Sequence, residues 1–478
     1  MASQHPTIIQ GGMGVAVSSW QLANAVARAG GLGVVSGTAL DGVVARVLQD
    51  GDPGGHVRRA LQHFPDQEIA ERVLNSYFLP DGRAEGQPYR PHPTLTIAPT
   101  RNAIELSLVG NFAEVWLAKE GHDGPIGINF LQKIQTATLS ATLGAMLAGV
   151  DYVLMGAGIP KEMPRVLTAF AEGHTAHMTI EVDDQTKTHT AHLDPRTYLG
   201  DTLPELTRPT FLAIISLHVL GGYLARDPEI RPDGFVVEGP VAGGHSAPPR
   251  GKLTLDEHGQ PIYSPKDDAD VAKMVALGLP FWLAGAWSTP EKVAAARAAG
   301  AEGVQCGTIF ALASESGLTD AIRADLLAEL RAGTLKVKND ALASPTGFPF
   351  KVARLEGTLS EQEVYEARNR ICDLGYLRQP AERPDGSIVY RCASEPVHMF
   401  TKKGGDVEET VGRKCLCNAL FANIGMPQRR KDGYVEEPAI TLGSDLVGAQ
   451  GLLAEHPDGW SGAEAVAYLL RDVEQPTA

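Results

Sequence analysis

Cysteine is scarce in this sequence, and basic residues are outnumbered by acidic ones. Five cysteines in 478 residues exclude a disulfide scaffold, because small secreted folds of that kind are dense in paired cysteines. The formal net charge of -15 argues against a nucleic-acid binder, since phosphate-backbone binding needs concentrated lysine and arginine. It does not exclude a single anionic cofactor held by backbone amides.

Long apolar runs are missing as well. No uncharged stretch is long enough to span a bilayer, and the N-terminus lacks the basic segment and apolar run of a secretory signal. We therefore expect a cytoplasmic protein that does not contact membranes.

Glycine, by contrast, is abundant at 52 residues, which indicates many tight loops. The length predicts one large domain with additions, or two to three domains.

Short apolar strands alternate with helices along much of the chain. Each strand candidate is followed by a helix or an insertion, which is the repeat of a parallel α/β fold. No G-x-G-x-x-G followed by an acidic residue occurs in the strand context of a dinucleotide-binding sheet. Eight repeats favour a (β/α)8 TIM barrel over a doubly wound sheet. The predicted strands are residues 7–10, 32–36, 125–129, 152–155, 211–216, 235–237, 281–284 and 303–306.

Two insertions interrupt this rhythm. Residues 37–123 hold helical stretches and a proline-rich run, and predict a helical insertion after the second strand. Residues 174–210 predict a smaller insertion after the fourth strand. From about residue 335 onward strands and helices no longer alternate. We expect a barrel over 1–335, with these two insertions, and a cysteine-containing, irregular C-terminal subdomain over 336–478 that packs on it.

The second insertion carries a local repeat, His-Thr-Ala-His at 174–177 and again at 189–192. A hairpin between the two copies would place His177 opposite His192. Two interpretations stay open: a metal ion shared by the pair, or a solvated hairpin with scattered imidazoles. We favour the hairpin, because two histidines rarely make a metal site without a third ligand.

Glycine loops at the expected barrel mouth indicate a phosphate site. Phosphates in this fold commonly sit at the loops after strands seven and eight, where the chain has Gly285 with Ala286 and Gly307 with Thr308. Small residues let backbone N–H groups reach phosphate oxygens, and a helix N-terminus adds partial positive charge. Gly243 and Gly244 follow strand six and lead into His245, a candidate catalytic residue because imidazole titrates near neutral pH. The loop Gly11, Gly12, Met13 and Gly14 would lie across the same mouth.

Five motifs in this order resemble the nitronate monooxygenase family, also called 2-nitropropane dioxygenase-like. The FMN-dependent enoyl-ACP reductases belong to the same superfamily, and the resemblance covers about residues 5–315. The chain departs from the usual pattern in having Gly285-Ala286 instead of Gly-Gly, and Pro240-Val-Ala-Gly-Gly before His245. The motifs are Ile9-Gln-Gly-Gly-Met-Gly14, Ala29-Gly-Gly-Leu-Gly33, Gly127-Ile-Asn129, Glu238-Gly-Pro-Val-Ala-Gly-Gly-His245 and Gly300-Ala-Glu-Gly-Val-Gln-Cys-Gly-Thr308.

The resemblance implies a flavoprotein with FMN stacked over the barrel mouth. The 11–14 loop and Asn129 would lie near the isoalloxazine ring and ribityl chain, and His245 matches the family's catalytic histidine. The FMN phosphate would be lined by Gly243, Gly244, Gly285, Ala286, Gly307 and Thr308.

Three functions remain open at this point. The first is a nitronate monooxygenase that oxidises alkyl nitronates or nitroalkanes with O2. The second is an NAD(P)H-dependent FMN enoyl reductase acting on acyl-carrier, polyketide or fatty-acid intermediates, with an acyl carrier protein as partner. The third is a non-catalytic flavin-binding module. The insertions and the long C-terminal part exceed a typical nitronate monooxygenase and leave the substrate open, and a homo-oligomer is compatible with the sequence.

Four of the five cysteines lie in the C-terminal part. Cys372, Cys392, Cys415 and Cys417 admit two interpretations: a zinc or iron–sulfur site, or buried small apolar residues. We favour the second, because the paired C-x-x-C spacing is missing. The segment 343–350 is predicted to pack on the barrel through its apolar side chains.

Overall fold

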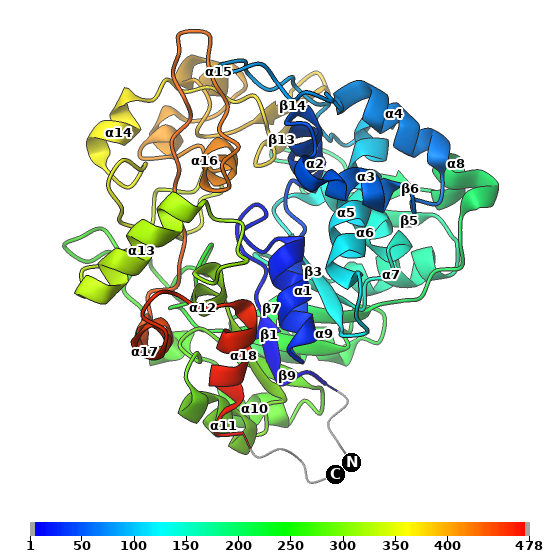
Figure 1. Ribbon diagram of the computed structural model, residues 1–478. Coiled ribbons are helices and arrows are strands. Elements are labelled where there is room, and N and C mark those ends of the chain that lie inside the picture. The colour runs from blue at the N-terminus through cyan, green and yellow to red at the C-terminus, as the bar shows by residue number, and fades with distance from the viewer. Residues whose placement is uncertain (1–4, 474–478) are drawn as a thin grey trace.

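The computed structural model describes residues 5–473, and its centre is a barrel of eight parallel strands (Figure 1). The strands follow the order β1-β10-β9-β8-β7-β4-β3-β2. Ile9 forms a parallel bridge with Leu32 just before β2, so the two ends of the sheet meet. The prediction of a TIM barrel is confirmed. The strands are β1 (Ile8–Gln10), β2 (Gly33–Ser36), β3 (Ile126–Leu131), β4 (Tyr152–Gly156), β7 (Thr210–Ile215), β8 (Gly234–Glu238), β9 (Phe281–Ala284) and β10 (Gly303–Cys306).

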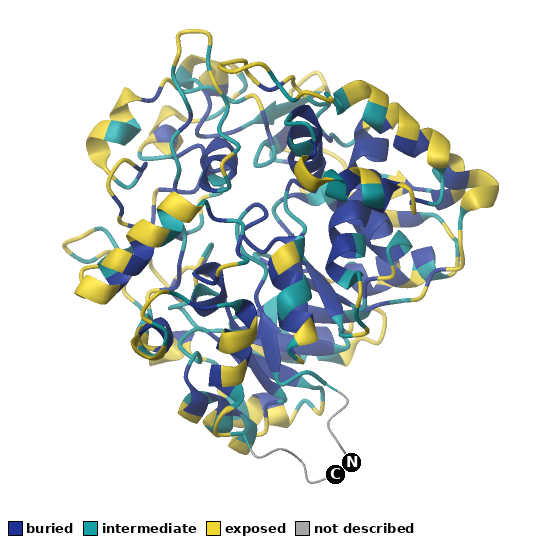
Figure 2. Ribbon diagram, viewed as in Figure 1, coloured by how far each residue is buried: buried dark blue, intermediate teal, exposed yellow. Residues whose placement is uncertain are grey.

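Both faces of the barrel sheet are buried, as Figure 2 shows. Successive side chains of a strand point to opposite faces. Val34, Leu154 and Trp282 belong to a small apolar cluster contributed by the strands, whereas Val35 and Val153 belong to the large cluster shared with the helices. This double burial explains why the strands read as continuous apolar runs instead of alternating patterns.

Two helices of the barrel begin at hydroxyl caps. The Ser19 hydroxyl accepts a hydrogen bond from the Leu22 N–H at the start of α1 (Trp20–Arg28). Thr289 caps α11 (Pro290–Ala298) in the same way, with proline at the first helical position. The other barrel helices are α6 (Gln135–Leu147), α7 (Met163–Ala171), α9 (His218–Arg226), α10 (Val271–Val275) and α12 (Thr308–Ala311).

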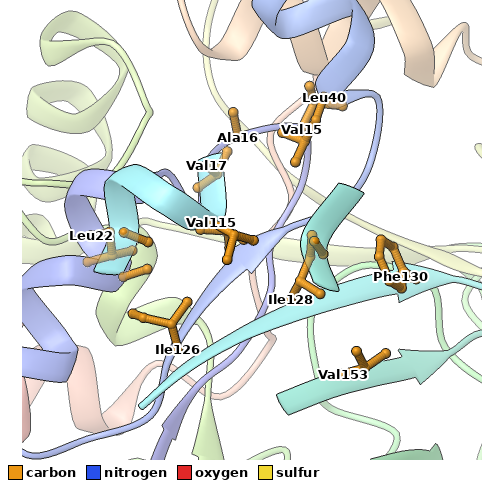
Figure 3. Packing of buried hydrophobic residues seen from close by; sticks show 14 of the residues in the cluster. Val15, Ala16, Val17, Leu22, Leu40, Val115, Ile126, Ile128, Phe130 and Val153 are labelled. Atoms are coloured by element: carbon orange, nitrogen blue, oxygen red, sulfur yellow. The ribbon is translucent and has the colours of Figure 1, made fainter. Parts of the chain in front are cut away.

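The helical insertion after β2 packs on one side of the barrel. Its longest helix, α5 (Arg101–Lys119), contacts α1, α2 and α6. Figure 3 shows Val115 of α5 close to Leu22 of α1 and to Ile126 and Ile128 of β3. The insertion therefore adds to the same apolar core. Its other helices are α2 (Leu40–Gln49), α3 (His56–Leu61) and α4 (Gln67–Tyr77).

The insertion after β4 is the predicted hairpin, followed by α8 (Pro195–Leu199). Its strands are β5 (Ala176–Ile180) and β6 (His189–Leu193), and His177 pairs with His192 in their register. The two imidazole centroids are 6.2 Å apart. Within residues 5–473 no three His, Cys, Asp or Glu side chains form a group that could hold a metal ion. The shared-metal interpretation is therefore not supported.

The C-terminal part wraps over the barrel and returns to its start. In Figure 1, α14, α15, α16 and the β13–β14 hairpin lie above the barrel, and α18 contacts α1, α11 and β1. No helix in residues 5–473 is long and apolar enough to cross a membrane. The elements are α13 (Asp320–Ala332), β11 (Val337–Asp340), β12 (Phe350–Ala353), α14 (Gln362–Ala367), β13 (Gln379–Glu382), β14 (Ile388–Arg391), α15 (Val397–Lys402), α16 (Leu416–Asn423), α17 (Val447–Glu455) and α18 (Gly462–Leu470).

Candidate active site

Two adjoining cavities at the barrel mouth are lined by all the residues that the sequence singled out for the cofactor and for catalysis. The first cavity holds Asn129 and His245. The second holds the glycine loops, namely Gly11, Gly12, Met13, Gly14, Gly243, Gly244, Gly285, Ala286, Gly307 and Thr308. Gly12, Gly14, Gly243 and Gly244 line both cavities, so the two form one continuous site.

The 11–14 loop is held by Gln10 at the end of β1. The Gln10 side-chain amide donates to the Gly11 carbonyl at 2.6 Å and to the Ser18 hydroxyl at 2.8 Å. Ser18 also accepts from the Met13 N–H at 3.0 Å, so Ser18 positions the loop whereas Ser19 alone caps α1. A Cβ on Gly12 would lie 2.3 Å from the Asn129 Cβ. Only glycine therefore allows this loop to lie against Asn129.

The loops after β9 and β10 form a cradle with free donors. Gly307 has φ -109° and caps α12. Within residues 5–473 the backbone N–H groups of Gly307 and Thr308 have no hydrogen-bond acceptor. Ala286 has φ +63°, a conformation that favours glycine, so the departure from Gly-Gly places alanine where the backbone is left-handed.

Gln305 lies between the two cavities. Its side chain lines both of them, and its buried Oε1 has no hydrogen-bond partner within residues 5–473. A buried polar atom at a cavity wall that has no protein partner is free to bond a polar group of a ligand. Together with the unpaired N–H groups after β10, it makes these cavities fit a polar cofactor with a phosphate group, as FMN is.

His245 is held by the C-terminal part of the chain. Its Nε2 lies 2.7 Å from the Ser344 hydroxyl, and its ring meets the Phe350 ring edge-on at 4.9 Å between centroids. Burial, reinforced by the positive charge of Lys133, lowers the pKa of His245 to about 4. The imidazole is therefore neutral at physiological pH and titrates below the near-neutral range expected from the sequence, because the site removes water from the ring; in its neutral form it can accept a proton.

Glu238, which is half-buried, and Lys351, which is buried, are two ionisable groups that the sequence did not reveal as site residues. Glu238 lines both cavities and a third one beside His245. Burial raises the pKa of Glu238 to about 7, and the charge of Lys351 opposes this. Lys351 is 1% exposed and donates to the Pro240 carbonyl at 2.6 Å. Burial lowers the pKa of Lys351 to about 8, while Glu238 raises it.

The loop after β8 is bonded to C-terminal segments on both sides. The Lys351 N–H donates to the Gly244 carbonyl at 2.9 Å. The Gly244 N–H donates to the Thr441 hydroxyl at 2.8 Å, and the Gly443 N–H donates to the Thr308 hydroxyl at 2.8 Å. A Cβ on Gly243 would meet the Gly443 nitrogen at 2.9 Å. Residues outside the barrel strands thus complete the walls of the site.

The four C-terminal cysteines do not gather into one metal site. Cys415 and Cys417 flank the start of α16, and Cys417 lines the first cavity. The Cys415 thiol instead accepts from the Asn418 amide at 3.5 Å. With no metal-holding group of three ligands in residues 5–473, a zinc or iron–sulfur site is not supported.

Part of the chain that forms this site matches a known protein family. Residues 216–341 match the family model of nitronate monooxygenase. The match spans β8, β9 and β10 with the loops that carry His245 and the glycine cradle, and it supports the resemblance that the motifs indicate. No curated protein matches the chain.

Several solved structures are similar at low identity. FabK from Thermotoga maritima is 17% identical over 98% of this chain and 92% of that chain, with a TM-score of 0.45. Nitroalkane oxidase from Streptomyces ansochromogenes is 16% identical over 98% and 95%, with a TM-score of 0.44. The enoyl reductase domain of MlnA from Bacillus amyloliquefaciens is 12% identical over 75% and 66%, with a TM-score of 0.39. These similarities are too weak to indicate a function.

Proposed function

We propose that this protein is an FMN-dependent oxidoreductase that oxidises alkyl nitronates or nitroalkanes with O2. The family match over residues 216–341 supports the broad class. The observation that carries the reaction is His245, a neutral imidazole at the junction of the first and third cavities and beside the glycine cradle.

FMN is held, in this proposal, by the residues that line the two adjoining cavities. The Gly307 and Thr308 N–H groups would donate to the phosphate, and Gly243, Gly244, Gly285 and Ala286 would leave room for it. The 11–14 loop, Asn129 and Gln305 would hold the rest of the cofactor. When bound, FMN supplies the electron transfer from substrate to O2.

His245 acts on the proton of the substrate. A neutral nitroalkane must lose a proton from the carbon beside the nitro group before it becomes a nitronate, and the imidazole accepts that proton. The Ser344 hydroxyl bonds to Nε2 and fixes the orientation of the ring. Lys133 adds positive charge near the site, which favours an anionic nitronate.

Replacement of His245 by asparagine tests this role. H245N should retain FMN, since the cradle residues are unchanged. Turnover of the neutral nitroalkane should fall about 100-fold, the size typical of a lost general base, whereas turnover of the preformed nitronate should fall much less. Equal activity of wild type and variant on the neutral nitroalkane would refute the proposal.

A second candidate function is an NAD(P)H-dependent FMN enoyl reductase. The third cavity favours it, because apolar residues such as Ile214, Leu217, Leu220 and Phe348 lead away from His245 and would suit an acyl chain, free or on a carrier protein. Anaerobic mixing with NADH or NADPH separates the two. Rapid bleaching of the flavin supports the reductase, whereas slow bleaching with nitronate turnover supports the monooxygenase.

A further inference from the structure

Cys372 and Cys392 form a pair of sulfurs outside the proposed active site. Cys372 lies on the loop between α14 and β13 and is partly exposed. Cys392 directly follows β14 and is 5% exposed. Arg391 pairs with Gln379 in the β13–β14 ladder, which brings Cys392 beside Arg378, and the Arg378 Nε bonds the Cys372 sulfur at 3.3 Å. Both cysteines are free. Two reduced sulfurs therefore lie near Arg378 at the open end of the β13–β14 hairpin.

Arg378 makes this pair asymmetric. Its Nε donates to the Cys372 Sγ at 3.3 Å, and its Nη2 donates to the Cys372 carbonyl at 2.6 Å. The hydrogen bond from Cys392, followed by the charge of Arg378, lowers the pKa of Cys372 to about 6 against the effect of burial. The pKa of Cys392 lies well above its ordinary range, because its proton is shared with Cys372 and it is buried.

The charged groups around the two cysteines do not remove the difference between their pKa values. The Glu395 carboxylate raises the pKa of Cys372, but the Lys403 ammonium lies 2.6 Å from that carboxylate and offsets its charge. Cys392 accepts or donates a hydrogen bond with the Ser394 hydroxyl at 3.2 Å. The result is one accessible thiolate beside one protonated thiol, the arrangement of an attacking and a resolving cysteine.

We propose that Cys372 and Cys392 are a redox-active dithiol that hydroperoxides oxidise to a reversible disulfide. The Cys372 thiolate attacks one peroxide oxygen, so that an S–O bond forms, the O–O bond breaks and an alcohol leaves after protonation. The Cys392 sulfur then attacks the sulfenic sulfur, the S–S bond forms, and the hydroxyl leaves as water with the Cys392 proton. Two electrons pass from the two sulfurs to the peroxide, and hydrogen peroxide gives two waters.

The pair is connected to the first cavity through its loop. Tyr376 and Leu377 lie between Cys372 and Arg378 in the chain, and both line that cavity. Oxidation removes the thiolate that Arg378 bonds and so loosens the loop that carries these two side chains. This consequence for the cavity rests on the proposed function, whereas the dithiol chemistry does not.

Thiol counting on the full-length protein tests the dithiol. Hydrogen peroxide should remove two of the five thiols, peptide mapping should find the bridge between Cys372 and Cys392, and dithiothreitol should restore both. C392S should stop at a sulfenic acid on Cys372 that dimedone traps. C306S is the matched control, since Cys306 is a buried thiol in the barrel, and it should still lose two thiols.

Arg378 provides a kinetic test. R378Q should slow the loss of thiols by about threefold near pH 7, because the pKa of Cys372 rises when the charge and hydrogen bond of Arg378 are lost and the thiolate fraction falls. Five thiols that persist in peroxide-treated wild type, a bridge between another pair, or a metal ion bound stoichiometrically by these thiols would overturn the proposal. The wild-type measurement stands even if a variant fails to fold, and it is independent of whether the protein binds FMN.

Discussion

The Ser344 hydroxyl lies 2.7 Å from Nε2 of His245, although 99 positions separate the two residues in the chain. Ser344 is fully buried and belongs to the segment between β11 and β12, outside the barrel strands. The candidate base is therefore oriented by a residue that the barrel itself does not supply. The C-terminal part of the chain is a component of the site.

Removal of the Ser344 hydroxyl should reduce turnover without releasing FMN. S344A leaves the His245 ring free to rotate, and a lost hydrogen bond of about 1 kcal/mol corresponds to roughly a fivefold fall in kcat. T346V is the matched control, because Thr346 bonds the Ser344 hydroxyl at 2.8 Å but has no direct contact with the His245 nitrogen among the described hydrogen bonds. Equal effects of the two variants on kcat would contradict the orienting role.

The depressed pKa of His245 predicts a pH dependence of stability. The ordinary histidine pKa is about 6.5, and that of the folded state is about 4. Between these values the unfolded chain binds a proton that the folded protein does not, so the free energy of unfolding falls as the pH is lowered.

Urea unfolding at pH 7 and pH 5 measures the contribution of His245 to the free energy of unfolding. Wild type should lose about 1–2 kcal/mol more than H245N between the two pH values. Identical losses in wild type and variant would show that the imidazole titrates normally.

The open space beside Gly307 predicts a selective loss of cofactor binding. A Cβ at this position would meet only the Met13 side chain, at 3.6 Å and beyond, and the backbone has a negative φ. G307A should therefore fold normally while its methyl group occupies the cradle, and the Kd for FMN should rise at least about tenfold. Fluorescence titration measures this. G222A, on α9, should bind FMN as wild type does; unchanged affinity in G307A would place the phosphate elsewhere.

Lys351 should matter more for stability than an ordinary lysine. Its ammonium is buried near Glu238 and donates to the Pro240 carbonyl, and a buried acceptor that loses its partner typically costs about 1–3 kcal/mol. K351M should lower the free energy of unfolding by about 2 kcal/mol, and the double variant E238Q/K351M should recover part of that loss, because no carboxylate then faces the apolar side chain. K338M is the control from the same hairpin, because Lys338 is 40% exposed and should cost under about 1 kcal/mol. Equal losses for both lysine variants would contradict the coupling.

Local patterns of the sequence predict the barrel well. All eight predicted strands are present within two residues of their predicted bounds, and the helical stretches expected in 37–123 form α2 to α5. These elements follow from apolar runs, glycine stops and caps such as Thr289, which act over a few residues. The pairing of His177 with His192 also follows, because the register of a short hairpin is set by its own turn.

Contacts over long sequence distances could not be predicted in the same way. The sequence indicates that 343–350 packs on the barrel, but nothing local marks Ser344 as the partner of His245. Thr441 reaches Gly244 across 197 positions, and Lys351 resembles a surface lysine until the fold buries it. Arg430, which stands in the basic run 429–431, is bonded to Asp373 and Glu436. Burial of this kind depends on tertiary packing and leaves no periodic signal.

The absorbance spectrum of the purified protein, recorded before and after anaerobic addition of an alkyl nitronate, tests the central claim most directly. The proposal predicts the bands of oxidised FMN at one cofactor per chain, their bleaching on addition of the nitronate, and their return when O2 is admitted. A colourless protein that does not take up added FMN would contradict the account of the site, and flavin bands that NADH bleaches but the nitronate does not would contradict the assigned reaction.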